Sequence, residues 1–269
     1  MNPIEAAARA IANAKTLLFT AGAGMGVDSG LPDFRGNEGF WRAYPPLAKL
    51  GIGFAQMANP NWFDSDPTLA WGFYGHRLNL YRETLPHQGF AVLKRWAEEK
   101  PARVYTSNVD GQFQKAELEN VCEVHGSIHY LQCVVPCSDA IWSAANTNVE
   151  VDDETFRARG ELPRCPNCGE LSRPNILMFS DGAWNLGRSL KQEQALTQWL
   201  GEIDKRELTV IECGAGTAIP TVRAFGERLQ KAGAQLVRIN ARESAGPSGT
   251  ISVGAGAREA LLEMEAVLG

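Results

Sequence analysis

This sequence lacks long apolar runs, a surplus of positive charge and abundant histidine. No stretch of its 269 residues approaches the ~18 consecutive apolar residues that a membrane helix needs. Its 26 Lys and Arg are outnumbered by 31 Asp and Glu, and the net charge of −5 offers no broad basic surface for nucleic acid. The alanine-rich residues 1–15 favour an amphipathic helix over a secretory leader. We therefore expect a cytoplasmic globular protein that contacts neither membrane nor nucleic acid.

The six cysteines are not spaced like a disulfide framework. Four of them form two close pairs, Cys133 with Cys137 and Cys165 with Cys168. In a chain expected in the cytoplasm, two close pairs separated in this way are typical of a zinc site. Four thiolates complete a tetrahedral shell and leave no position for a substrate, so the zinc would be structural. Four unrelated free thiols are the alternative.

Short apolar runs alternate with helical patterns along the chain. The expected strands are Thr16–Thr20, Arg103–Thr106, Leu208–Glu212, Gln235–Ile239 and Thr250–Val253. Besides the first helix, the expected helices cover residues 88–99, about 220–232 and 258–268. This alternation indicates an α/β fold, a Rossmann-like parallel sheet with helices on both faces.

Two segments interrupt the alternation of strands and helices. Residues 37–85 carry aromatic-rich helical patterns, and residues 127–175 carry the cysteine pairs. We expect them to form a smaller helical and zinc-ribbon domain, while residues 1–36, 86–126 and 176–269 form the Rossmann-like domain. The expected ligand site is a cleft between the domains, at the carboxyl ends of the strands.

The most informative segment, residues 22–36, directly follows the first expected strand. Closely spaced glycines let backbone N–H groups approach a phosphate. The dinucleotide fingerprint requires a further glycine where Val27 stands, which disfavours a plain dehydrogenase. An acid, an aromatic ring and an arginine follow at residues 33–35. The combination indicates a site that binds a nucleotide and also performs chemistry on it.

Polar residues follow the second expected strand and precede the cysteine pairs. Asn108 and Asp110 could hydrogen-bond a carboxamide and a ribose; the alternative is an Asx turn capping a helix that begins near Gln112. His125, followed by Gly126, is one of only four histidines. Its imidazole can act as a general base near neutral pH, and a structural histidine is the alternative.

These motifs, in this order, resemble the sirtuin family of NAD-dependent protein-lysine deacylases. The resemblance covers nearly the whole chain. It rests on residues 22–36, 106–111, 124–127, the two cysteine pairs, and residues 173–179, 213–220 and 239–240.

The resemblance implies an NAD co-substrate, a structural zinc and an acyl-lysine protein or peptide as partner. The products would be nicotinamide, free lysine and 2′-O-acyl-ADP-ribose. His125 would deprotonate a ribose hydroxyl, and Asn108 and Asp110 would line the nicotinamide pocket. The residues that the resemblance places against NAD are Gly22, Ala23, Gly24, Asp33, Phe34, Arg35, Ser107, Asn108, Asp110, Gly214, Ala215, Gly216 and Asn240.

Several residues depart from the family's pattern. Gly26 stands where the family usually has Ser, Ser107 where it has Gln, and Phe113 where it often has His; the first cysteine pair has a three-residue gap. The changes at positions 26 and 107 motivate an alternative enzyme on the same site, an NAD glycohydrolase or ADP-ribosyltransferase. A non-catalytic NAD- or ADP-ribose-binding module is a further alternative, against which His125 argues.

One segment bears on the acyl group. Residues 66–77 are similar to the helix of desuccinylase-type sirtuins, which hold an acidic acyl chain with a Tyr and an Arg three positions apart. Tyr74 and Arg77 share a helix face, and Arg77 falls within an arc of apolar residues. A buried cation needs a partner, and the carboxylate of a succinyl group could supply it. The alternatives are pairing with a structural acid and extension to solvent.

Overall fold

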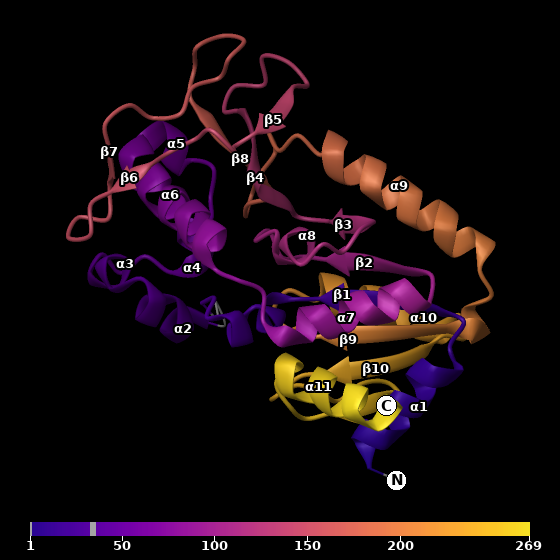
Figure 1. Ribbon diagram of the computed structural model, residues 1–269. Coiled ribbons are helices and arrows are strands. Elements are labelled where there is room, and N and C mark those ends of the chain that lie inside the picture. The colour runs from indigo at the N-terminus through magenta and orange to yellow at the C-terminus, as the bar shows by residue number, and fades with distance from the viewer. Residues whose placement is uncertain (1, 33–35) are drawn as a thin grey trace.

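A parallel sheet occupies the centre of the computed structural model, which describes residues 2–32 and 36–269 (Figure 1). Its strands are β1 (Thr16–Ala21), β2 (Ala102–Thr106), β3 (Val121–Glu123), β9 (Leu208–Cys213), β10 (Gln235–Ile239) and β11 (Ile251–Val253). They lie in the order β11-β10-β9-β1-β2-β3, and each neighbouring pair is parallel. The first strand, β1, lies in the middle of the sheet, and the chain adds β2 and β3 on one side of it. The chain then returns to form β9 on the other side of β1 and adds β10 and β11 outward from there. This is the doubly wound topology that the sequence predicted.

Helices cover both faces of the sheet because strand side chains point alternately to either side. One face packs against α1 (Pro3–Asn13), α7 (Gln88–Glu99) and α11 (Ala257–Leu268), and the other against α9 (Gly187–Glu202) and α10 (Thr221–Lys231). In β1, Leu17 and Phe19 belong to the first of these cores, and Leu18 between them belongs to the second.

A second region lies beside the sheet and contains most of the other elements (Figure 1). Its helices are α2 (Gly36–Ala43), α3 (Pro45–Lys49), α4 (Phe54–Met57), α5 (Trp62–Ser65) and α6 (Pro67–Glu83). Its antiparallel strands are β4 (Gly126–Cys133), β5 (Ile141–Ser143) and β8 (Ser172–Ile176), in the order β5-β4-β8, and the pair β6 (Glu150–Val151) and β7 (Ala158–Arg159). The aromatic side chains of these helices form a hydrophobic core of their own.

The first helix confirms the predicted amphipathic pattern. Asn2 caps α1 by accepting a hydrogen bond from the Ile4 N–H, and the buried face includes Ile4, Ala7, Ala8 and Ile11. Among the helices within the described ranges, none combines the length and the apolarity needed to cross a membrane.

Strand β3 is the member of the sheet that the sequence did not predict. The five predicted strands are present within one residue at each end. β3 has only three residues, and one of them, Glu123, is a buried acid paired with Arg188 of α9 at 2.5 Å. A short segment that ends in an acid carries no apolar run, so its pairing with β2 defines it as a strand.

Candidate active site

Two glycine loops meet at the point where the strand order reverses, between β1 and β9. The Gly22 N–H donates to the Cys213 carbonyl and the Gly24 N–H to the Gly214 carbonyl, both at 3.0 Å. A Cβ on Gly214, whose φ is +64°, would lie 2.3 Å from the Gly24 carbonyl carbon, and one on Gly22 would lie 2.8 Å from the Ala215 Cα. These glycines are therefore required by loop-to-loop packing at the place where open α/β sheets bind ligands.

The two loops also present unpaired backbone donors. Within the described residues, the N–H groups of Ala23, Ala215 and Gly216 have no hydrogen-bond acceptor. Ala23 begins the short turn η1 (Ala23–Met25) directly after β1. Clustered free N–H groups at the start of a turn suit a phosphate. The predicted contacts Asp33, Phe34 and Arg35 lie outside the residues that the structure describes.

Asn108 connects β2 to the glycine loop after β1. Its Nδ2 donates to the Gly22 carbonyl at 2.9 Å, and its backbone N–H donates to the Thr106 hydroxyl. Its Oδ1 accepts no hydrogen bond from any residue in the described ranges. The fold thus uses one end of the amide and leaves the other for a ligand. The half-buried Ser107 lies beside it, its N–H bonded to the Ala21 carbonyl at 3.2 Å.

Asp110 is buried on the loop that precedes α8 (Gln112–Lys115). Its Oδ1 accepts from the Gln112 N–H at 2.9 Å, so the Asx turn that was the alternative for this residue is present. Its backbone carbonyl accepts from His129 Nε2 at 2.9 Å. Its Oδ2 faces Gly26, where an added Cβ would lie 3.6 Å away. Burial raises the pKa of Asp110 to about 6, so this carboxyl changes charge close to neutral pH.

Replacing Asp110 by Asn should flatten the dependence of stability on pH. Because its folded-state pKa is raised from 3.8 to about 6, protonation of Asp110 stabilises the fold. That contribution is full below about pH 3.8 and is lost as the pH rises through about 6. Asp110→Asn keeps an acceptor for Gln112 and should raise the free energy of unfolding at pH 8 by up to about 3 kcal/mol. Urea unfolding of both proteins between pH 4 and pH 8 checks this, and parallel curves would contradict it.

His125 lies between β3 and β4, facing the start of α10. Its Nε2 lies 3.4 Å from the Thr221 hydroxyl, and its backbone carbonyl accepts from the Leu177 N–H at 2.9 Å. Gly126 after it has a φ of +78°, and a Cβ there would lie 2.1 Å from the Asn175 carbonyl oxygen. Burial lowers the pKa of His125, which keeps its imidazole neutral and able to accept a proton.

Asn240, which follows β10, is bonded within the fold. Its Nδ2 donates to the Ala215 carbonyl at 2.9 Å, and its Oδ1 accepts from the N–H groups of Arg242 and Glu243 at 3.0 Å. Glu243 in turn accepts from the Thr217 N–H at 3.2 Å and hydroxyl at 2.5 Å. Glu243 belongs to none of the predicted motifs; its only signal in the sequence is an acid shortly after a strand end, where Rossmann folds bind ribose hydroxyls.

Helix α6 buries Tyr74 and Arg77, which are 0% and 5% exposed. Arg77 donates from Nε and Nη2 to the Tyr81 hydroxyl at 3.0 and 2.7 Å, and its guanidinium lies 5.3 Å from the centroid of the Phe73 ring. The alternative of extension to solvent is therefore wrong. The charge of Arg77 lowers the pKa of Asp110, opposing the burial that raises it. The arginine is thus close enough to the site to act on it electrostatically.

The four predicted cysteines converge. The Sγ atoms of Cys133, Cys137, Cys165 and Cys168 all lie within 4.8 Å of one another, with Cys133–Cys168 at 3.6 Å and Cys137–Cys165 at 3.7 Å. A tetrahedral zinc with Zn–S bonds of about 2.3 Å separates its sulfurs by about 3.8 Å. The four thiols fit a structural zinc despite the three-residue gap in the first pair, and the alternative of unrelated thiols is wrong.

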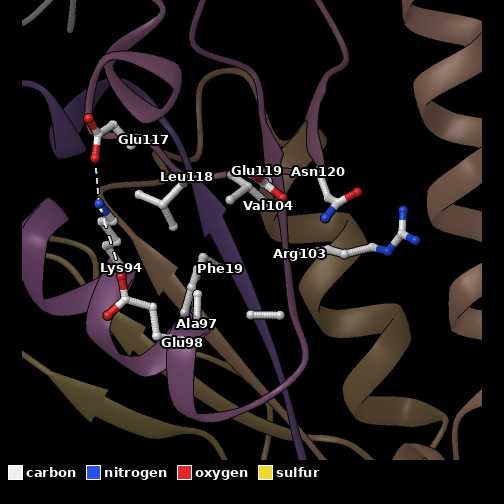
Figure 2. Close-up of a pocket in the computed structure, with 11 residues that line it drawn as sticks. Phe19, Lys94, Ala97, Glu98, Arg103, Val104, Glu117, Leu118, Glu119 and Asn120 are labelled. Atoms are coloured by element: carbon white, nitrogen blue, oxygen red, sulfur yellow. Dashed lines mark hydrogen bonds and ion pairs between the residues drawn. The ribbon is translucent and has the colours of Figure 1, made fainter.

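A separate groove of about 400 Å³ lies between α7, β2 and the segment before β3 (Figure 2). Lys94 at this groove pairs with Glu98 at 4.0 Å and with Glu117 at 2.5 Å. Phe19 and Val104 of the sheet also line it. None of the predicted site residues within the described ranges lines this groove. This groove is therefore separate from the candidate active site at the glycine loops.

Known proteins resemble this chain along most of its length. A sequence profile of the Sir2 family matches residues 22–198. The NAD-dependent protein deacylase of Pyrococcus furiosus is 30% identical over 238 residues, which are 87% of this chain and 85% of the relative. NAD-dependent protein deacylase 1 of Archaeoglobus fulgidus is 27% identical over 239 residues, 88% and 85% of the two chains. A solved Sir2 homologue–NAD complex shares the fold, with a TM-score of 0.77 at 22% identity over 98% of this chain and 93% of the other. Because the profile spans more than half of its residues, this protein belongs to the Sir2 family.

Proposed function

We propose that this protein is an NAD-dependent protein-lysine deacylase. The observation that carries the proposal is the grouping of two glycine loops, Asn108, Asp110 and a neutral His125 around the carboxyl ends of β1, β2, β3 and β9. Membership of the Sir2 family and the deacylase activity named for its relatives support it. The acyl-lysine peptide would enter the cleft as an extended strand held by main-chain hydrogen bonds.

NAD would be held by groups that the fold leaves unpaired. As co-substrate it supplies the ADP-ribose that accepts the acyl group, and it releases nicotinamide. The free N–H groups of Ala23, Ala215 and Gly216 would bind its diphosphate. Asn108, through its free Oδ1, and the Asp110 carboxyl would hydrogen-bond the nicotinamide carboxamide and the adjoining ribose.

His125 would act as the general base. A ribose hydroxyl becomes a nucleophile only when a neighbouring group accepts its proton, and a neutral imidazole does this near pH 7. Burial lowers the pKa of His125 and so keeps it in the accepting form. The partial burial of His125 would also limit the access of water, which would otherwise compete for the reactive sugar carbon.

A zinc ion at the four cysteines would stabilise the strands that position the catalytic base. Cys133 ends strand β4, and Gly126, the residue after His125, begins it. Strand β8 pairs with β4 at both ends, through Gly126 with Ile176 and Cys133 with Ser172. A metal bound to the cysteines would therefore hold the two strands that support the backbone of His125.

The deacylase proposal is tested by incubating the protein with NAD and acetyl- or succinyl-lysine peptides. We expect nicotinamide release that depends on the peptide, and 2′-O-acyl-ADP-ribose as the product seen by mass spectrometry. Release without peptide, with free ADP-ribose or a modified protein, would instead establish an NAD glycohydrolase or ADP-ribosyltransferase. That alternative is motivated by Gly26, which places no side chain beside the Asp110 carboxyl.

We further propose that the enzyme prefers acidic acyl groups such as succinyl. Arg77 is a buried cation whose guanidinium lies among the rings of Phe73, Tyr74 and Tyr81. The buried Tyr74 hydroxyl has no hydrogen-bond partner in the described part of the chain. A substrate carboxylate would pair with the Arg77 guanidinium and accept a hydrogen bond from the Tyr74 hydroxyl.

The variant Arg77→Met should lose acidic substrates selectively. We expect kcat/KM for a succinyl-lysine peptide to fall about 100-fold, equivalent to about 2.7 kcal/mol, because a buried carboxylate would lose its charged partner. The value for an acetyl-lysine peptide should change by less than about threefold, since no charge is recognised. Tyr74→Phe, which removes only the hydroxyl, is the matched control and should cost about tenfold on succinyl alone. Equal losses on both peptides would count against acidic-acyl recognition.

A further inference from the structure

His87 joins helix α7 to the turns that follow β1. Its Nδ1 accepts from the Gly89 N–H at 3.0 Å and so caps α7. Its Nε2 lies 2.9 Å from the Met25 carbonyl in η1, and its backbone N–H donates to the Ser29 hydroxyl in η2 (Val27–Ser29) at 3.0 Å. Because Nδ1 accepts, the single proton of the neutral ring is on Nε2, which donates it to Met25.

The surroundings of His87 are built around its ring. The side chain is buried at 8% exposure, and its ring centroid lies 4.8 Å from that of Phe90. A Cβ on Gly89 would lie 2.6 Å from His87 Cε1, so glycine at this position makes room for the imidazole. A short side chain such as Asn can cap a helix. The ring's second nitrogen is what extends the connection from the cap to the Met25 carbonyl.

The segment that His87 holds is the second half of the loop that carries the nucleotide-binding motif. The first half, Gly22 and Gly24, is bonded to the loop after β9. Asp28, within η2, accepts from the Arg258 N–H at the start of α11 at 2.9 Å. The loop therefore has separate attachments to β9, to α7 and to α11. A loop that is held in place before binding does not have to be ordered by its ligand.

We propose that His87 is a positioning residue for NAD: its neutral imidazole holds the turns at Met25 and Ser29 so that the free N–H group of Ala23, which begins η1, faces the diphosphate. The inference rests on the proposed NAD-dependent function of this site. It makes the α7 cap part of the binding machinery, although His87 itself touches the loop and not the nucleotide.

The proposal includes a dependence on pH. Burial lowers the pKa of His87 from 6.5, the hydrogen bond to Met25 and the charge of Asp28 raise it, and Arg258 lowers it. The folded-state pKa of His87 is below its unfolded value. The contribution of neutral His87 to the stability of the fold is therefore full above about pH 6.5 and is lost as the pH falls through the folded-state pKa. Protonated Nδ1 can no longer accept from Gly89, so acid should release the cap and the turn together.

The test compares His87→Asn with His87→Ala in the full chain. Asn keeps a strong helix cap but cannot make the ring's bond to Met25, whereas Ala loses both contacts. We expect KM for NAD to rise about tenfold in both variants, the effect of one hydrogen bond of about 1.4 kcal/mol, with kcat within about twofold. Only His87→Ala should lower the unfolding temperature clearly. Amide hydrogen exchange of residues 22–30 should accelerate in both variants.

Two further readouts separate the outcomes. Between pH 8 and pH 5.5, KM for NAD should rise more in the wild type than in His87→Asn, which has no imidazole to protonate. A wild-type KM and wild-type exchange of residues 22–30 in His87→Asn would overturn the proposal, because His87 would then be only a helix cap. If the wild type releases no nicotinamide with any acyl peptide, the proposed function fails; NAD affinity by calorimetry and hydrogen exchange still decide the role of His87.

Discussion

Replacing His125 by Asn is expected to lower kcat for lysine deacylation about 1,000-fold, within the range of about 10²–10⁴ for general-base catalysis. Asn has a similar size but cannot accept the proton of a ribose hydroxyl at neutral pH. The fold should survive, because the imidazole contributes a contact of only 3.4 Å to the Thr221 hydroxyl. Product formation is measured by mass spectrometry of the acyl-ADP-ribose at saturating NAD and peptide.

The control for His125 is the affinity for the nucleotide. Calorimetric Kd values for NAD should agree within about threefold between His125→Asn and the wild type, because a general base mainly affects the transition state. Thr221→Val removes the hydroxyl near the ring and should cost less than about tenfold, the value of one hydrogen bond. A His125→Asn enzyme with wild-type kcat would exclude His125 as the base.

Removing the zinc is expected to unfold the region formed by β4, β5 and β8 and to abolish activity. Cys165→Ser replaces a buried thiolate by a hydroxyl, which is a poor zinc ligand. Structural zinc binding in small zinc-finger peptides is worth about 10–16 kcal/mol at pH 7. We therefore expect less than one zinc per chain and an unfolding temperature lowered by about 10 °C or more, since about 1 kcal/mol corresponds to about 2–4 °C at this size.

Metal analysis and thermal unfolding check the zinc prediction together. Cys122→Ser is the matched control, because Cys122 is also a buried cysteine but lies on β3, outside the cluster. It should retain one zinc per chain even where the new hydroxyl lowers stability. A Cys165→Ser protein that still binds one zinc per chain would show that the four sulfurs do not form the metal site.

Most of the sheet could be predicted because its strands contain short apolar runs that alternate with helical patterns along the chain. Strand β3 and helix α9 could not be predicted in this way. Glu123 is buried in β3 only because Arg188 of α9 pairs with it. The buried residues of α9 are Ser189, Leu196 and Leu200, which do not form a continuous apolar stripe. Strand β3 and helix α9 stabilise each other, and neither has in its own sequence a pattern that predicts it.

The candidate site likewise contains residues that the sequence indicates and one that it does not. Asn108, Asp110 and His125 stand in short motifs and could be proposed from the sequence. From the sequence, Asp110 could bind a ligand or form a turn; the structure shows the turn through Oδ1, while Oδ2 faces Gly26. His87 had no motif to identify it, because its partner Met25 is 62 positions away.

The features that depend on near neighbours follow from the order of residues alone. These are the alternation of strands and helices, the glycine motif that begins at Gly22 and the spacing of the cysteine pairs, each set by local conformation and side-chain type. Which distant groups come into contact is known only from the folded structure. It placed Gly214 against Gly24 and His87 against Met25. A hydrogen bond or a close backbone approach of this kind depends on distances between distant segments, and those distances are set by the packing of the whole chain.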